Sequence, residues 1–201
     1  MSLPGRRTTG WASLDTIRPF ANLLVTVGSV IICLMLSITR LPGMELLGIS
    51  PNWLLIWVVA WSVKRTAWQA AIAAIVLGLI QDGLTAPNPL IHNTILTSVH
   101  PSHSLSLVLV GIFTARLQKQ RYLREDFISV ALIVFPAVLL AETAIALQFL
   151  FLGDRDVSVI WTEHQRIALC SAILSSLWAP VVYFPLNNWW QHIQHLNKSQ
   201  T

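Results

Sequence analysis

The chain has 201 residues, of which 54% are hydrophobic and 11% charged, and its mean hydropathy is +0.62. These values lie outside the range of a soluble domain of this length and indicate an integral membrane protein. The net charge of +4 and the pI near 9.6 do not indicate nucleic-acid binding, because the basic residues are sorted along the chain rather than gathered in one patch.

Six apolar runs follow a polar arm over residues 1–19, and they predict six membrane helices. The first run covers residues 20–38 and is long enough to cross a hydrocarbon core of ~30 Å. No small-residue cleavage site follows it, so we expect a permanent helix rather than a removable signal peptide. The second run covers residues 46–63 and carries Pro51 near its start. Proline is tolerated there because the first N–H groups of a helix have no partner within the helix.

The next two runs are short. Residues 67–81 reach only about 22 Å as a helix, so this third helix must be short or must continue past Asp82. Residues 83–103 contain three prolines and are expected to form an outer loop, from which residues 104–117 return as another short helix.

The last two runs complete the predicted domain. Residues 127–152 contain Pro136 and lead to an acidic outer loop. Residues 167–186 form the sixth helix, which is expected to end at Trp189 and Trp190, where these two side chains would anchor it at the interface. A polar tail over residues 191–201 follows. We therefore expect an all-α integral membrane protein whose single six-helix domain covers residues 20–190.

The basic residues fall mostly on one side of this arrangement. Ten of the thirteen lie in alternate connections, and by the positive-inside rule these connections and both termini face the cytoplasm. The ten are Arg6, Arg7, Arg18, Lys64, Arg65, Arg116, Lys119, Arg121, Arg124 and Lys198.

Glu142 is a carboxyl group near the middle of the fifth run. A charge at that depth costs ~3 kcal/mol or more, so this side chain is expected to be buried in the bundle, paired or protonated. Three roles remain open: a structural hydrogen-bonding acid, a contact for a partner or ligand, or proton chemistry. Thr143 and Gln148 are candidate hydrogen-bond partners.

Asp82 ends the third run and is followed by Gly83, which would let the chain leave the helix in a left-handed conformation. An acid at a helix C-terminus opposes the helix dipole, so another group should stabilise it. Arg40 and Arg166 lie on the same side and would serve. Structural pairing and a binding role are both open.

Two stripes at helical spacing are candidates for helix packing or for binding a partner. Small residues permit close helix approach in lipid, and aromatic residues form packed faces or contacts for a ligand or partner helix. The stripes are Ala70, Ala74 and Gly78 on the third helix, and Trp53, Trp57 and Trp61 on the second.

Neither catalysis nor a cofactor is indicated. His92, His100 and His103 have no acid or cysteine nearby in the sequence, so we expect no metal. No catalytic serine motif, phosphate loop or metalloprotease motif is present. Cys33 and Cys170 lie inside apolar runs and are expected to pack there.

Several short motifs also suggest a family. Six short-looped helices in 201 residues, with Pro51-Asn52-Trp53 opening the second helix, resemble the bacterial rod shape-determining protein MreD family. The segment Gly-Leu-Ile-Gln-Asp at residues 78–82 resembles the Gly-x-x-x-Asp signature of that family. Residues 117–127, Leu-Gln-Lys-Gln-Arg-Tyr-Leu-Arg-Glu-Asp-Phe, look like its cyanobacterial branch.

The resemblance implies a non-enzymatic scaffold of the cell-elongation machinery in the bacterial plasma membrane, with a part in cell shape and peptidoglycan synthesis. Its partners would be an MreC-like bitopic membrane protein and, through it, an MreB-like filament and the peptidoglycan synthases. The implied fold is similar to that of the substrate-capture subunits of energy-coupling-factor vitamin transporters.

A transporter subunit is the alternative function. It would hold a vitamin behind the outer loops, near Asp82, His92 and Trp161. Such subunits dock their partner through an alanine-xxx-alanine stripe on the first helix, which here reads Ala-Asn-Leu-Leu-Val at residues 21–25 and lacks it. A membrane-embedded hydrolase would need a nucleophile or metal beside Glu142 or Asp82.

Overall fold

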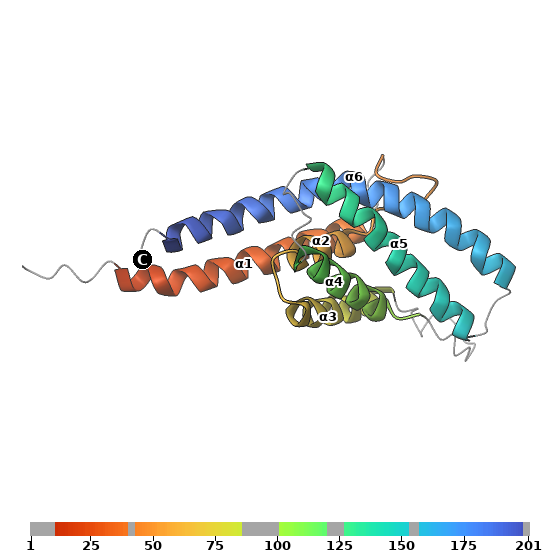
Figure 1. Ribbon diagram of the computed structural model, residues 1–201, viewed down its shortest axis with the longest axis horizontal. Coiled ribbons are helices and arrows are strands. Elements are labelled where there is room, and N and C mark those ends of the chain that lie inside the picture. Colours follow the sequence, from red (N-terminus) through yellow and green to blue (C-terminus); the bar gives the residue numbers. More distant parts are fainter. Residues whose placement is uncertain (1–10, 40–42, 86–100, 120–126, 153–156, 199–201) are drawn as a thin grey trace, which may run out of the picture.

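The computed structural model describes residues 11–39, 43–85, 101–119, 127–152 and 157–198, and within these ranges it contains six α-helices and no strand (Figure 1). The predicted all-α class is confirmed. The helices are α1 (Trp11–Ile38), α2 (Trp53–Ser62), α3 (Ala67–Thr85), α4 (His103–Lys119), α5 (Phe127–Leu152) and α6 (Val157–Lys198).

Four of these helices, α1, α3, α5 and α6, are long and apolar enough to cross a membrane. The other two, α2 and α4, are shorter apolar helices. With 10 residues, α2 is about 15 Å long, which is half of a hydrocarbon core. The chain is therefore a membrane protein by the length and composition of its helices.

The short helix α2 lies at the centre of the molecule and contacts each of the other five helices. Its residues from Trp53 to Ala60 are each at most 3% exposed. A helix that is apolar on every side must be buried on every side, so its composition accounts for its position.

Helix α2 begins later than the sequence predicted, at residue 53 instead of 46. Leu46 and Ile49 exchange two backbone hydrogen bonds of 2.9 and 3.0 Å around Leu47 and Gly48, which have positive φ angles of 55° and 78°. This turn cannot belong to a helix. The helix then starts behind Asn52, whose side chain accepts from the backbone N–H of Leu55 at 3.1 Å.

Three other helices extend beyond their predicted ends by more than two residues. The first begins at Trp11, and α3 continues past Asp82 to Thr85. Of the two alternatives given for the third helix, the continuation past Asp82 is therefore confirmed, and Asp82 does not close it. The sixth runs through Trp189 and Trp190 to Lys198, with Pro180 and Pro185 inside it. The predicted stop at the two tryptophans was wrong, because nothing at that point breaks the helix.

The helices pack as two neighbouring pairs, α3 with α4 and α5 with α6, around α2. In the described part of the chain the backbone of α1 comes close to that of α2 alone. The first residues of α1 and the last residues of α6 lie at the same end of the molecule (Figure 1).

Candidate functional site

A polar cluster forms where the end of α3 meets the start of α4. Asp82 Oδ1 accepts the backbone N–H of His103 at 2.8 Å, and its Oδ2 accepts the Ser102 hydroxyl at 2.9 Å. The Nδ1 atom of His103 also lies 2.8 Å from Asp82 Oδ1, and Ser104 Oγ lies 3.4 Å from Oδ2. Asp82 and His103 are about one-quarter exposed.

Asp82 therefore acts as a cap for a helix other than its own. The first N–H groups of α4 have no partner within that helix, and a carboxylate is favoured beside the positive end of the helix dipole. Asp82 opposes the dipole of α3, but it is stabilised by the N-terminus of α4. This placement ties α3 to α4.

Gln148 of α5 joins the same cluster. Its Oε1 accepts the backbone N–H of Ser102 at 2.8 Å, and its Nε2 donates to the Ser102 carbonyl at 3.1 Å. Three helices thus meet at one residue, and both backbone groups of Ser102 are satisfied without water.

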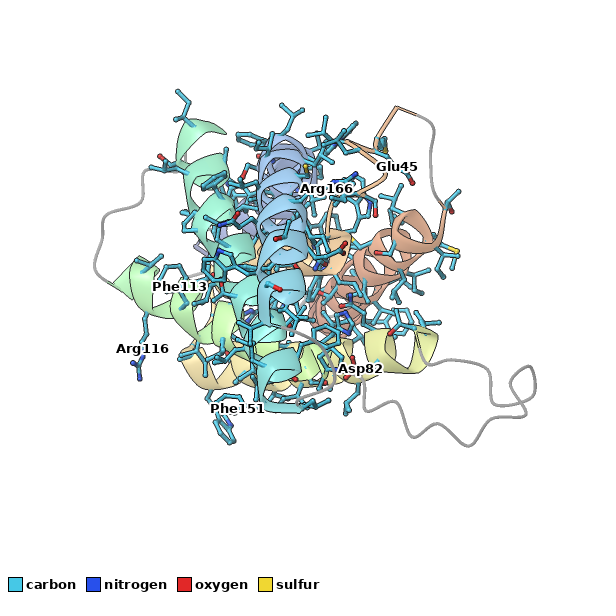
Figure 2. All side chains as sticks on the ribbon, turned by 90° about the vertical axis from the view of Figure 1, so that its right-hand side faces the viewer. Glu45, Asp82, Phe113, Arg116, Phe151 and Arg166 are labelled. Carbon is cyan, nitrogen blue, oxygen red and sulfur yellow. The ribbon has the colours of Figure 1, made fainter. Side chains whose placement is uncertain are left out.

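Arg166, one of the two arginines expected to pair with Asp82, does not pair with it. Arg166 donates instead to the carbonyl of Leu47 at 3.1 Å. Figure 2 shows Arg166 and Asp82 on different sides of the molecule, and Arg116 projecting away from the bundle. The other candidate, Arg40, lies outside the described residues.

The hydrogen bonds within this cluster are typical of a structural contact between helices. Both serine hydroxyls donate to the Asp82 carboxylate, which also accepts the backbone N–H of His103, so these bonds hold α3 and α4 together. No group of three metal-ligating side chains is present among the described residues. His92 and His100 lie outside them.

Glu142 lines a small cavity between α5 and α6 and does not belong to a hydrogen-bonded network of the described residues. The cavity holds about 90 Å³ and is shared with Glu163 and His164 among apolar side chains. Neither expected partner reaches Glu142, because Thr143 donates to the Leu139 carbonyl at 2.6 Å and Gln148 bonds Ser102. Pockets for vitamin-sized ligands are typically 300–1,000 Å³, so this one is too small.

Because Glu142 makes no hydrogen bond within the described chain, we expect Glu142→Leu to keep the melting temperature of the purified protein within about 2–4 °C. The control is Gln148→Leu on the same helix, which removes two hydrogen bonds from Ser102 and should lower it further. Thermal unfolding in mild detergent measures both. A larger loss for the Glu142 variant would mean that Glu142 holds a structural partner.

The tryptophan stripe of α2 packs inside the bundle. The ring of Trp53 lies 5.6 Å from that of Trp178, and Trp57 stacks on Trp61 at 5.8 Å. The indole N–H of Trp57 donates to Ser29 Oγ of α1 at 2.8 Å. This is the only side-chain hydrogen bond between α1 and α2 that the described residues show.

The small-residue stripe of α3 packs against α4. Ala70 and Ala74 are fully buried, and a Cβ atom added to Gly78 would lie 2.2 Å from the Cα atom of Ser104. Gly111 of α4 in turn faces the Ala70 carbonyl, which lies 3.2 Å from an added Cβ. A bulky residue at Ala74 is therefore expected to disturb the fold itself.

Of the predicted site residues, Gly78 and Asp82 come together at the start of α4, whereas Glu142 and the tryptophans lie elsewhere. Ser102 and Gln148 complete the cluster, and a serine just before an apolar helix is a signal that could have indicated the first of them. Comparisons of the chain with protein-family models, with curated proteins and with solved structures found no match.

Proposed function

We propose that this protein is a non-enzymatic scaffold subunit of the machinery that elongates the bacterial cell, held in the plasma membrane and bound to an MreC-like bitopic protein. Through that partner it would serve an MreB-like filament and the peptidoglycan synthases. The proposal rests on the family resemblance of the motifs and on one structural observation, the exposure of α1.

Helix α1 is the least packed of the four spanning helices. In the stretch Phe20–Ile38 only 6% of the residues are buried, against 28%, 39% and 44% in the corresponding stretches of α3, α5 and α6. Cys33 is the single buried side chain there. A helix held on one side only leaves its remaining surface for lipid or for another helix.

The side of α1 that faces away from α2 has the spacing of a helix-packing seam. Its exposed apolar side chains recur at intervals of three and four residues over about 28 Å, which is close to the thickness of a hydrocarbon core. We call these residues the outer face of α1: Phe20, Leu24, Val27, Ile31, Met35 and Ile38.

A single-span partner is the occupant that suits the outer face. The face is apolar along its whole length, so it offers packing area over a full bilayer crossing but no polar group to orient a soluble ligand. The proposal also places both termini in the cytoplasm. The distribution of basic residues favours this, and the common location of the two ends of the bundle agrees with it.

The test is affinity purification of the full chain in mild detergent, with the recovered proteins identified by mass spectrometry. We expect an MreC-like single-span protein, and we expect the pair Leu24→Ala and Ile31→Ala to reduce its recovery at least about tenfold, since truncating two interface anchors typically costs more than 2 kcal/mol. Both side chains are at least half exposed, so the fold should not suffer.

The matched control is the pair Ile128→Ala and Leu132→Ala on α5, whose side chains are 77% and 71% exposed. This pair should leave recovery unchanged. Equal losses with both pairs would contradict a docking role for α1. Recovery of transporter ATPase subunits together with a bound vitamin would support the alternative function instead.

A further inference from the structure

An apolar groove runs between α1 and α6, with Trp53 of α2 among its lining residues. It holds about 620 Å³ and is lined by residues between positions 25 and 36 of α1 and between 178 and 189 of α6. The backbones of the two helices do not come close to each other in the described part of the chain, and the groove lies between them. Figure 1 shows α1 and α6 running side by side in opposite directions.

The groove is half as long as a membrane is thick. Eleven steps of 1.5 Å, from position 25 to 36 or from 178 to 189, give about 16 Å. One leaflet contributes about 15 Å to the hydrocarbon core, whereas a spanning helix needs about 30 Å. The length therefore matches one acyl chain and is too short for a whole transmembrane helix.

Two buried indole N–H groups without partners lie in or beside the groove. The indole N–H groups of Trp61 and Trp189 are buried, and no described residue accepts a hydrogen bond from either. Trp189 lines the groove, and Trp61 stacks on Trp57, which is bonded to the groove residue Ser29. Buried donors of this kind are costly unless an acceptor satisfies them.

Two cations lie near these tryptophans, outside the lining of the groove itself. The guanidinium group of Arg65 lies 5.1 Å from the ring centre of Trp61. The ammonium group of Lys64 donates to the side chain of Asn187, two residues before Trp189. An acceptor with negative charge would therefore complement both the unpartnered N–H groups and the basic pair.

We propose that the groove between α1 and α6 binds one anionic phospholipid, with an acyl chain along the groove and the phosphate beside Arg65 and Trp189. The phosphate oxygens accept from the Trp189 indole and from the Arg65 guanidinium. The leaflet is the one that faces Lys64 and Arg65. The bound chain fills the space between two helices whose backbones stay apart, and so adds to the contacts that hold α1 on the bundle.

The test uses native mass spectrometry of the full chain in mild detergent, titrated with dioleoyl phosphatidylglycerol or with dioleoyl phosphatidylcholine. We expect one phosphatidylglycerol per chain, bound at least about fivefold more tightly than phosphatidylcholine, since one basic residue contributes about 1 kcal/mol toward an anionic lipid. Arg65→Gln should remove this preference. Trp189→Phe should weaken phosphatidylglycerol binding by a similar factor.

A groove-filling variant tests the position of the acyl chain. A Cβ atom added to Gly28 meets no atom within 4 Å, so Gly28→Leu can extend into the groove without a backbone clash. This variant should lose the bound lipid. The controls are Gly83→Leu, where an added Cβ also meets nothing, and Trp68→Phe at a 75% exposed tryptophan. Both should keep the lipid and its preference.

Two results would overturn the proposal. One is equal binding of the two lipids by the unchanged chain. The other is a Gly28→Leu variant that keeps its phosphatidylglycerol but no longer recovers a single-span protein, because the groove would then seat a helix. The outer-face pair Leu24→Ala and Ile31→Ala should leave lipid binding intact, which separates this site from the proposed partner surface.

Discussion

Gly78→Ala is expected to lower the melting temperature of the purified protein by about 10 °C, corresponding to about 3 kcal/mol for a chain of this size. The added Cβ would lie 2.2 Å from the Cα atom and 2.6 Å from the backbone nitrogen of Ser104. Neither atom is the end of a flexible side chain, so α4 itself must move. Overpacking of this kind costs up to about 3 kcal/mol, and occasionally more.

The same substitution five residues further along the same helix provides the control. A Cβ at Gly83 meets no atom within 4 Å, and alanine is a better helix former than glycine by up to about 1 kcal/mol. Gly83→Ala should therefore leave the melting temperature unchanged or raise it. Two variants with equal melting temperatures would show that α3 and α4 do not pack closely at Gly78.

The elements of this fold follow from its hydrophobic runs, and their number and type were predictable for that reason. The central place of α2 was less accessible. Its apolar composition predicts burial on every side, but the length of the apolar run from 46 to 63 predicted a helix that crosses the whole membrane. The turn at Leu47 and Gly48 shortens it, and a leucine at positive φ carries no signal in the sequence.

The candidate site shows the same limit. The sequence singled out Asp82 and correctly required a stabilising partner, but it offered arginines on the basis of charge. The actual partners are the N-terminus of α4 and two serines. The helix dipole and the serine hydroxyls stabilise the carboxylate without carrying a formal charge. Which N-terminus meets which acid depends on helix packing, so only the structure reveals it.

The surroundings of Glu142 could not be read from its depth alone. A carboxyl near the middle of an apolar run was expected to be buried in the bundle, paired or protonated, and its role stayed open. It lines a small cavity between α5 and α6, beside Glu163 and His164 of α6. The extra length of α6 brings these polar side chains alongside it, and that extension was not predicted.

Asp82→Ala is expected to destabilise the protein by about 2–3 kcal/mol, because it removes the cap of α4 and leaves the Ser102 hydroxyl and the His103 N–H without their acceptor. Asp82→Asn keeps one carbonyl oxygen, so its loss should be about half as large. Glu45→Ala replaces an exposed acid and should change stability little. Melting temperatures in mild detergent rank the three.

A double-mutant cycle with Ser102→Ala decides whether Asp82 acts through the contact that the structure places there. If the hydroxyl donates to the carboxylate, the double variant should lose at least about 0.5 kcal/mol less than the sum of the single losses, because neither change can remove that hydrogen bond twice. Additive losses would assign Asp82 to other contacts. An Asp82→Ala protein that melts normally but no longer recovers its single-span partner would contradict the structural role of Asp82 and assign the carboxylate to partner binding.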